Sequence, residues 1–472
     1  MVFSVQDICE VFFSIEEKYN LNYQEIQGCY PWLLTRFFLY VNISSKIDTF
    51  GLPQQNNLSL LDKFKTFVPF CINSIFSNPL IGNYTKDFLI FDHPRKTFFK
   101  NQYRDIYSCF LVDFLKEYSY EVIEAPYFNK HFSKKEKHVK YSDRILLGSY
   151  VHKKVSKINF TDSEKELIRN IKKDLDDAFD LDINLEEIFK NHILNFQYEY
   201  KKYIKLFSKR KPKKIFVVVA YQNFPIVAAA KDLGIEVLEL QHGLIGNYHL
   251  GYSYPNSRLN GEIPYFPDKI LTFSEYWLSN DCYPISSENI IPVGFPYFDY
   301  QSKNFRNIEK KGNQILFISQ GTIGKLLSEL AYQVALELKD YKIIYKLHPG
   351  EYETWKQNYP NLVNASNLDN VEIIGNNNVP LYKLFAESTY QVGAFSTAIF
   401  EGLTFNCKTF LMDLPGIEHV KDLIDENYAF KIKDASDLIN NLETFNPQDY
   451  PANFFFKSFD KELFKKVIFN EE

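Results

Sequence analysis

The feature that most constrains this fold is a regular alternation of apolar strand-like runs with helical patterns in the C-terminal half of the chain. Short runs rich in Ile, Val, Phe and Leu recur at residues 214–221, 235–240, 270–273, 290–293, 314–318, 342–347, 371–374, 390–394 and 408–412. Most of them are separated by stretches with helical spacing. Strands that alternate with helices are typical of parallel sheets covered by helices on both faces. The sequence therefore predicts an α/β fold with doubly wound parallel sheets.

Length and pattern together predict two domains, because 472 residues exceed what one hydrophobic core usually supports. A helical, aromatic segment covers about the first 80 residues, extended runs follow at 88–91 and 120–123, and 160–210 has the pattern of a charged helical insertion. The irregular stretch at 247–267 is the expected boundary, since it contains Gly251, Gly261 and three prolines. We therefore expect an N-terminal domain at 1–262, a C-terminal domain at 263–452 and a closing helix at 453–472. Two such Rossmann-like domains facing each other across a cleft form the architecture called GT-B.

Composition narrows the classes of partner and the compartment. The net charge of −5 provides no basic field for nucleic acid. Six cysteines without close pairs fit neither a disulfide framework nor a zinc ribbon, which favours a reducing cytosol. Asp7 and Glu10 interrupt the N-terminal apolar residues, so no signal peptide is expected, and the apolar stretch at 32–41 is too short to span a bilayer. We expect a cytoplasmic protein, and peripheral contact with the inner membrane stays open.

Polar residues follow several of the expected strands at the point where each strand ends. The carboxyl ends of parallel strands share one edge of the sheet, and ligands of open α/β sheets bind there. His348 follows one strand and precedes Pro349, so its imidazole can donate to a phosphate oxygen. Lys346 or Lys325 would add charge, and Glu351 could contact ribose or base. The other candidates at strand ends are His242 and the turn Ser319-Gln320-Gly321-Thr322.

A second anion site is expected at Ser396 and Thr397. Both would cap the helix that continues through residues 399–403, presenting hydroxyls and backbone N–H groups to a phosphate. Glu401 lies one helical turn beyond Thr397 and is placed to accept hydrogen bonds from ribose hydroxyls. Together these residues predict a binding site for a nucleotide-activated donor.

These motifs and their order resemble the bacterial surface-polysaccharide GT-B transferases, which include capsule glycosyltransferases and the CDP-glycerol glycerophosphotransferases of teichoic acid synthesis. The resemblance spans about residues 214–415 and is carried by Gln241-His242-Gly243, Pro267-Asp268-Lys269-Ile270, Val293-Gly294-Phe295-Pro296, Lys346-Leu347-His348-Pro349 and Phe395-Ser396-Thr397 through to Glu401. It implies that His348, Ser396 and Thr397 hold the donor phosphates and that Glu401 binds ribose. It also implies that His242 lies near the reacting centre.

The sequence of this chain differs from that of the glycerophosphotransferases after Gly243. This chain reads Leu244-Ile245-Gly246-Asn247-Tyr248-His249 where those enzymes have a Thr-Pro-Leu-Lys type of sequence, which favours a sugar over glycerol phosphate as the transferred group. His242 is the leading candidate for the base, with His249, Asp92 and Glu124 as substitutes. No metal or cofactor is expected, because the pair Asp180 and Asp182 lies in the charged helical region and not at a strand end.

We therefore predict a glycosyltransferase that moves a sugar from a CMP-, CDP- or UDP-linked donor to a glycan or lipid-linked glycan acceptor, in capsule or lipopolysaccharide synthesis. The reaction is expected to be inverting and metal-independent. A polyol-phosphate transferase, a nucleotide-sugar epimerase and a non-catalytic binding subunit remain as alternatives. Basic stretches at 130–157 and 201–214 could attract an anionic acceptor or the inner membrane face.

Overall fold

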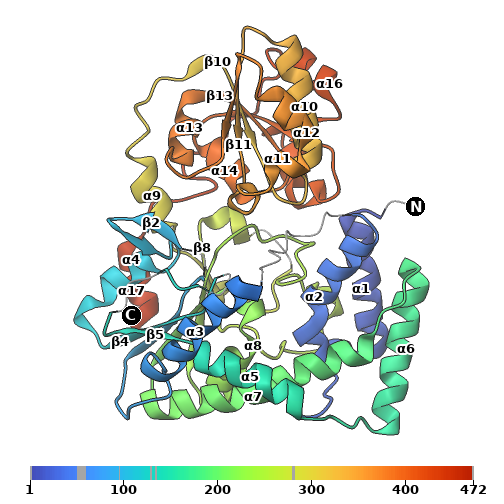
Figure 1. Cartoon of the computed structure of the whole chain (residues 1–472), viewed down its shortest axis with the longest axis vertical. Helices are drawn as coiled ribbons and strands as arrows, with labels where there is room; N and C mark the ends of the chain where they lie inside the picture. The colour runs from blue at the N-terminus through green and yellow to red at the C-terminus, as the bar shows by residue number, and fades with distance from the viewer. Residues whose placement is uncertain are drawn as a thin grey trace.

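The protein was analysed as a computed structural model that describes residues 3–49, 60–94, 96–127, 130–132, 136–278 and 282–469, with side chains described from residue 68 in the third helix. Figure 1 shows two lobes, one above the other, each built around its own sheet. Within the described residues, no helix is long and apolar enough to cross a membrane.

The first sheet has seven parallel strands in the order β5-β4-β1-β6-β7-β8-β9. Its strands are β1 (Phe88–Phe91), β4 (Tyr120–Glu124), β5 (Val139–Tyr141), β6 (Lys214–Val218), β7 (Glu236–Leu240), β8 (Lys269–Thr272) and β9 (Ile290–Pro292). Numbered within this sheet, the order is 3-2-1-4-5-6-7, so the direction of strand addition reverses between β1 and β6. Such a reversal is the usual ligand position in a Rossmann-like sheet.

The second sheet has six parallel strands in the order β12-β11-β10-β13-β14-β15. They are β10 (Lys311–Ile318), β11 (Lys342–Lys346), β12 (Val371–Ile374), β13 (Ser388–Gly393), β14 (Lys408–Met412) and β15 (Ala429–Ile432). This is the Rossmann order 3-2-1-4-5-6, with its reversal between β10 and β13. The predicted α/β fold of GT-B type, with two Rossmann-like sheets, is therefore confirmed.

Helices cover both sheets, and several begin at a side-chain cap. The first lobe contains α1 (Val5–Tyr19), α2 (Pro31–Lys46), α3 (Leu60–Phe76), α4 (Cys109–Phe114), α5 (Asp143–Val155), α6 (Asp162–Phe179), α7 (Leu185–Arg210) and α8 (Phe224–Asp232). A short hairpin, β2 (Thr97–Phe99) and β3 (Gln102–Arg104), belongs to the same lobe. Thr161 and Glu164 form a capping box that starts α6, and Ser4 and Asp7 do the same for α1.

The second lobe contains α10 (Gly324–Glu337), α11 (Trp355–Asn358), α12 (Pro360–Ala365), α13 (Leu381–Glu387), α14 (Thr397–Thr404), α15 (Lys421–Asp425) and α16 (Ala435–Asn441). The helix α9 (Pro296–Ser302) leads from the first lobe to the second. The last helix, α17 (Lys461–Phe469), returns to the first sheet, where Phe464 and Ile468 pack with Phe88 and Phe216 in one buried cluster.

The change of domain falls later in the chain than the expected boundary at residues 262 and 263. β8 pairs with β7 through Leu271 and Leu240, and β9 pairs with β8, so both strands extend the first sheet. The irregular stretch at 247–267 therefore lies inside the first lobe. Proline and glycine content marks irregular backbone in either setting, whereas the partner of a strand is decided by tertiary pairing.

The chain crosses between the lobes at two adjacent points. The outgoing crossing contains Gly294, which has a φ of +91° and approaches the backbone of the returning crossing. A Cβ on Gly294 would lie 2.8 Å from the carbonyl oxygens of both Lys457 and Ser458. Both the left-handed backbone and the close approach require glycine here, which gives the Val293-Gly294 motif a structural reason.

Candidate functional site

In the second lobe, two polar turns flank the reversal point between β10 and β13. Ser319 to Thr322 follow β10, and Ser396 and Thr397 follow β13 at the start of α14. The Ser396 hydroxyl accepts a hydrogen bond from the N–H of Ala398 at 3.3 Å. The first turn of α14 therefore presents backbone N–H groups at the sheet edge, which is a favourable environment for an anion.

The turn after β10 carries buried polar atoms that lack partners. Gln320 Oε1 and Thr322 Oγ1 are shielded from solvent and have no hydrogen-bond partner among the residues that the structure describes. Between them, a Cβ on Gly321 would meet no atom within 4 Å. Buried polar atoms are usually satisfied, so this turn is suited to receive a polar ligand at the predicted donor position.

His348 is held by its own turn. Its Nδ1 accepts a hydrogen bond from the N–H of Gly350 at 3.1 Å, within the short 3-10 turn η7 (Pro349–Glu351). In a neutral imidazole whose Nδ1 accepts, the proton lies on Nε2. The structure thus orients His348 with Nε2–H as a donor, as the expected contact to a phosphate oxygen requires.

The expected ligand contacts of Glu351 and Lys346 are not supported, because both side chains are used within the protein. Glu351 is fully buried and accepts hydrogen bonds from the backbone N–H of His348 at 2.6 Å, Tyr359 Oη at 2.7 Å and Ser319 Oγ at 2.9 Å. Lys346 Nζ donates to Tyr352 Oη at 2.7 Å, and burial lowers the pKa of Lys346 to about 8. Both residues therefore position the turn that carries His348.

Glu401 lies on α14, one turn beyond Thr397, as the sequence spacing predicts. It is partly buried, and Tyr382 Oη donates to its Oε1 at 3.3 Å. α14 packs closely on β13, since a Cβ on Gly402 would lie 2.0 Å from Gln391 Oε1. Close packing of this kind fixes the position of Thr397 and Glu401 relative to the sheet.

In the first lobe, His242 lies at the end of β7 and belongs to a hydrogen-bonded series. The hydroxyl of Tyr252 donates to Glu239 Oε1, and His242 Nδ1 lies 3.3 Å from Tyr252 Oη. Glu239 is fully buried, and burial raises its pKa to about 7, against the opposing hydrogen bond from Tyr252. Since Tyr252 donates to Glu239, its oxygen can accept from His242 Nδ1, which leaves Nε2 as the basic nitrogen.

A strained backbone position lies beside this series, at the reversal point of the first sheet. Val219 directly follows β6 and adopts a φ of 63° and a ψ of 63°, which is rare for a β-branched residue. The next N–H, that of Ala220, donates to Glu239 Oε1 at 3.1 Å, and Asn223 Nδ2 donates to the carbonyl oxygen of Val219 at 3.0 Å. Strain that the surroundings maintain is a common property of functional sites.

The two lobes meet where their candidate groups lie. A Cβ on Gly243, the residue after His242, would lie 3.6 Å from Thr397 Oγ1 at the start of α14. Gln241 holds this turn, because its Nε2 donates to the carbonyl oxygen of Gly243 at 2.9 Å and its Oε1 accepts from the N–H of Phe273 at 2.8 Å. The carboxyl edges of the two sheets therefore bring the histidine turn and the anion site together.

His249 has a structural setting that differs from the one expected of a base. Its ring stacks on Phe37 with centroids 5.3 Å apart, and its Nδ1 accepts from the N–H of Gly251 at 3.2 Å. Burial lowers the pKa of His249 to about 4. A histidine with such a low pKa is a weak base, so His249 supports the loop rather than serving as the alternative to His242.

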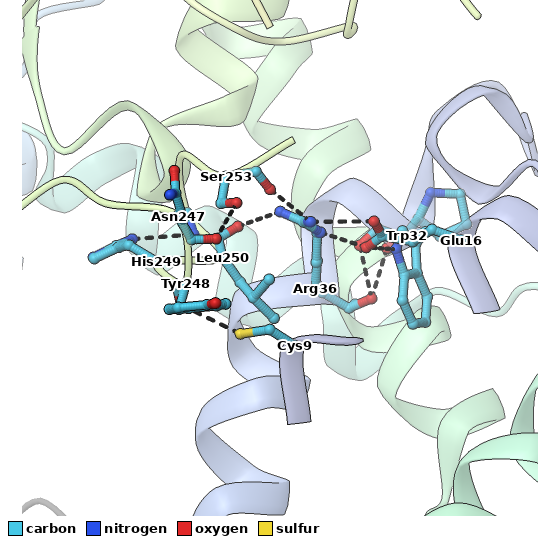
Figure 2. Close-up of polar contacts among 12 residues, drawn as sticks. Cys9, Glu16, Trp32, Arg36, Asn247, Tyr248, His249, Leu250 and Ser253 are labelled. Carbon is cyan, nitrogen blue, oxygen red and sulfur yellow. Dashed lines mark hydrogen bonds and ion pairs between the residues drawn. The ribbon is translucent and has the colours of Figure 1, made fainter. Parts of the chain in front are cut away.

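The loop that carries His249 is held by the N-terminal helices, as Figure 2 shows. Arg36 on α2 is buried and pairs with Glu16 on α1, with Nε to Oε1 at 2.5 Å. The same guanidinium donates to the carbonyl oxygens of Leu250 at 2.5 Å and Ser253 at 2.7 Å. The helical N-terminal segment thus fixes the loop that follows the His242 turn.

Sequence reasoning missed His93, which the structure places beside His242. It follows β1, and the two imidazole rings stack with centroids 6.3 Å apart. A signal was present, because Phe88–Phe91 is an apolar strand followed by Asp92 and then by a His-Pro pair, like the pair at His348. Asp92 itself, expected as a substitute base, has a side chain that is only 7% exposed and pairs with Lys96 at 2.5 Å.

Glu124, the other substitute base, belongs to a buried charged cluster at the ends of β1, β4 and β5. His131 bridges Glu124 Oε1 and Asp143 Oδ1, each at 2.7 Å, and these hydrogen bonds raise the pKa of His131 to about 9 against the effect of burial. Burial raises the pKa of Asp92 to about 7.

In the charged helical region, Asp182 pairs with Lys172 at 2.6 Å.

Several solved structures resemble this chain at low identity. UDP-GlcNAc 2-epimerase from Methanocaldococcus jannaschii is 12% identical, with a TM-score of 0.48, over 81% of this chain and 99% of that one. The enzyme of the same name from Neisseria meningitidis, bound to UDP-GlcNAc, is 12% identical over the same shares, with a TM-score of 0.45. The wall teichoic acid polymerase TagF is 11% identical over 82% of this chain and 89% of that one, with a TM-score of 0.38.

No protein-family model and no curated protein sequence matches this chain. At TM-scores below 0.5 the structural likeness carries no argument about activity. The two strand orders of the chain itself identify its fold, and its side chains must carry any statement about function.

Proposed function

We propose that this chain is a glycosyltransferase of GT-B type that moves a sugar from a nucleotide-activated donor to a glycan acceptor. The observation that carries the proposal is the close approach of Gly243 to Thr397: a Cβ on Gly243 would lie 3.6 Å from Thr397 Oγ1. It puts a histidine suited to act as a base next to a helix N-terminus suited to bind a diphosphate. Group transfer from a nucleotide needs both groups at one place.

The donor would lie along the edge of the second sheet. Its phosphates fit the N–H groups and hydroxyls at Ser396 and Thr397, and the Nε2–H of His348 can add a hydrogen bond. Glu401 remains the candidate for ribose. Gln320 Oε1 and Thr322 Oγ1 supply further polar atoms from the turn after β10. The N–H groups of the first turn of α14, the hydroxyls of Ser396 and Thr397, and the Nε2–H of His348 are the donors that would stabilise the negative charge of the departing nucleotide.

The acceptor would enter from the first lobe. In an inverting transfer the acceptor hydroxyl gives its proton to His242 Nε2, and its oxygen forms a bond with the anomeric carbon. The bond from that carbon to the donor phosphate breaks, and the electron pair leaves with the phosphate oxygen. Tyr252 and Glu239 support the protonated imidazole through Nδ1, because the hydroxyl of Tyr252 connects His242 to the carboxylate.

The proposed setting is bacterial capsule or lipopolysaccharide synthesis, with a CMP-, CDP- or UDP-linked donor and a glycan or lipid-linked glycan acceptor. This part rests on the family resemblance of the motifs around His242, His348 and Ser396. A metal-independent reaction is proposed because the carboxylate pair Asp180 and Asp182 lies in the charged helical region and not at a strand end.

The first test is nucleotide binding measured by thermal shift with CMP, CDP, UDP, GDP and ADP. A ligand that binds only the native state at a hundred times its Kd stabilises it by about 2.7 kcal/mol. We expect one nucleotide to raise the melting temperature, His348→Ala to abolish this increase, and the control His138→Ala to retain it. His138 is a suitable control because its ring pairs with Glu136, on another part of the first lobe. No increase with any nucleotide would contradict the proposal.

The second test separates transfer from its alternatives. His242→Ala should retain the nucleotide-induced shift and lose turnover by about 100- to 10,000-fold, as expected for loss of a general base. Product formed from the donor without any acceptor would identify an epimerase instead. Transfer of a polyol phosphate would identify the glycerophosphate type of reaction, and nucleotide binding without turnover in wild type would indicate a binding subunit.

A further inference from the structure

In its described C-terminal half, residues 68–76, the helix α3 exposes apolar side chains and buries polar ones. Three apolar side chains of this half point to solvent: Ile72, Ile75 and Phe76 are 45%, 62% and 78% exposed. The opposite side of the same helix carries Asn73 and Ser74, which are only 6% and 4% exposed. A helix on the surface of a protein in water usually has the reverse pattern, so the outer side of α3 is suited to an apolar environment.

The neighbouring helix α5 also exposes apolar side chains. α3 and α5 pack against each other in the first lobe, where Figure 1 shows them side by side. Tyr150, Val151 and Val155 on α5 are 58%, 50% and 73% exposed. These residues together with those of α3 define the α3–α5 face: Val68, Ile72, Ile75, Phe76, Tyr150, Val151 and Val155.

Within residues 68–86 and 144–157, the described segments that carry the α3–α5 face, every charged side chain is basic, and the acidic Asp143 at the start of α5 is buried. Residues 144–157 carry Arg144, Lys153, Lys154 and Lys157 and no acidic side chain, and residues 68–86 carry Lys86 and no acidic side chain. Lys154 and Lys157 are exposed, and Lys154 Nζ lies 5.8 Å from the centre of the Tyr150 ring. The whole chain has a net charge of −5, so this basic character is local.

The α3–α5 face also lies near the edge of the first sheet that carries the candidate site. The N–H of Tyr141 at the end of β5 donates to the carbonyl oxygen of Ser77 at 2.9 Å, which places the C-terminal end of α3 at that edge. Asp143, the first residue of α5, belongs to the charged cluster at the same edge. A partner on the α3–α5 face would therefore be close to the side from which an acceptor enters.

We propose that the α3–α5 face docks the protein on the surface of an anionic lipid bilayer. Apolar side chains that insert at the boundary of headgroups and acyl chains, flanked by lysines that attract anionic headgroups, are the two elements of interfacial membrane binding. The basic flank favours an anionic bilayer over a second copy of this chain, because two copies that met at this face would bring their lysines together, and like charges repel. The proposal is independent of which group the enzyme transfers.

The test measures co-flotation of the full-length chain with lipid vesicles. One vesicle type is pure phosphatidylcholine, and the other contains about 30% phosphatidylglycerol, which gives the surface a negative potential. We expect binding to the anionic vesicles that weakens at high salt. The triple variant Ile72→Ser/Ile75→Ser/Phe76→Ser should lower the partition coefficient at least about tenfold, because each side chain loses apolar area that enters the lipid.

The apolar triple variant and a lysine variant of the α3–α5 face each have a control in the second lobe that changes the same kind of side chain. Leu326→Ser/Leu336→Ser removes two side chains that are each 44% exposed on α10 of the other lobe, and it should leave binding unchanged. Lys153→Gln/Lys154→Gln should weaken binding to anionic vesicles about fivefold per lysine. Exposed lysines of the second lobe, changed in Lys339→Gln/Lys356→Gln, should have no such effect.

The following outcomes would overturn the proposal. One is the failure of wild type to float with anionic vesicles at low salt, and another is a loss of binding in the control variants as large as that in the α3–α5 variants. A dimer in solution that the α3 triple variant converts to monomer, without vesicle binding by wild type, would assign the face to contact between copies. Melting temperatures of all variants separate a loss of binding from a loss of folding.

Discussion

The hydroxyl of Tyr252 connects the candidate base His242 to Glu239, a buried carboxyl group that is sensitive to pH. Because burial raises its pKa from 4.5 to about 7, the folded state holds the proton more tightly than the unfolded chain. The stability that this protonation provides is complete below pH 4.5 and is lost as the pH rises towards 7. Near pH 8 the protein keeps a charged Glu239 at a cost in stability.

Glu239→Gln should therefore stabilise the protein at pH 8, by up to about 3 kcal/mol, and have little effect at pH 4.5. The amide oxygen can still accept from Tyr252 Oη and the N–H of Ala220, which both reach Oε1. Urea denaturation of wild type and variant at the two pH values measures this difference. An equal loss of stability at both pH values would contradict the assigned ionisation.

At the scale of single residues, sequence order located His242, His348, Ser396 and Thr397 at strand ends, where the structure has them. It could not show that Glu351 turns inward, since a carboxylate three residues after a histidine can equally cap a turn or face solvent. Nor could it join Glu239 to Tyr252, because their contact depends on how a loop of 12 residues folds back.

Among the elements, α14 depends on close contact with β13. A Cβ on Gly402 would lie 2.0 Å from Oε1 and 2.6 Å from Cδ of Gln391, a buried side chain that also binds Thr409. Gly402→Ala should lower the free energy of unfolding by about 1–3 kcal/mol through overpacking, and it should weaken nucleotide binding because Thr397 moves with the helix.

Gly312→Ala is the matched control for this substitution. Gly312 lies in β10, where a Cβ would meet no atom within 4 Å. Its free energy of unfolding should stay within about 0.5 kcal/mol of wild type. Chemical denaturation measures both variants, and a loss of similar size in the control would show that contact with Gln391 is not the cause.

The N-terminal helices α1 and α2 hold the loop after His242 through Arg36. Arg36→Met would leave the buried carboxylate of Glu16 with Trp32 Nε1 as its remaining side-chain donor among the described residues (Figure 2). The carbonyl oxygens of Leu250 and Ser253 would lose their bonds to the guanidinium. Removing one partner of a buried pair costs about 3–5 kcal/mol. We expect a loss of that size in urea denaturation.

Lys18→Met tests an ion pair of the same helix α1 at the surface. Lys18 pairs with Asp174 at 2.6 Å, and its side chain is 57% exposed. Solvent and salt screen exposed pairs, which therefore contribute little to stability, so this variant should remain close to wild type. If both variants lost the same amount, burial of the Arg36 pair would not explain its contribution.

For the whole molecule, two buried histidines, one in each lobe, make the stability of the folded state depend on pH. His249 of the first lobe and His419 of the second have pKa values lowered to about 4 and about 3, mainly by burial, and His249 acts electrostatically on His419. Both rings are neutral in the folded protein, whereas the unfolded chain binds protons below pH 6.5. Stability should therefore fall as the pH decreases from about 6.5 towards 4.

His419→Gln should reduce this loss, by up to about 2 kcal/mol at pH 5, and change little at pH 8. The buried His419 Nδ1 has no hydrogen-bond partner among the described residues, so the substitution removes no hydrogen bond from that atom. The measurement is the urea midpoint of both proteins from pH 8 to pH 5. Parallel curves would show that another group causes the acid sensitivity.

The sequence by itself determined that this chain forms two parallel Rossmann-like sheets with polar residues at their strand ends. Apolar runs alternating with helices specify strand direction, and strand direction places His242, His348 and Ser396 on carboxyl edges. Tertiary structure alone decided which sheet received β8 and β9, which polar side chains turned inward, and that Gly243 meets Thr397. These outcomes depend on contacts between residues far apart in the chain, and local pattern carries no information about such pairs.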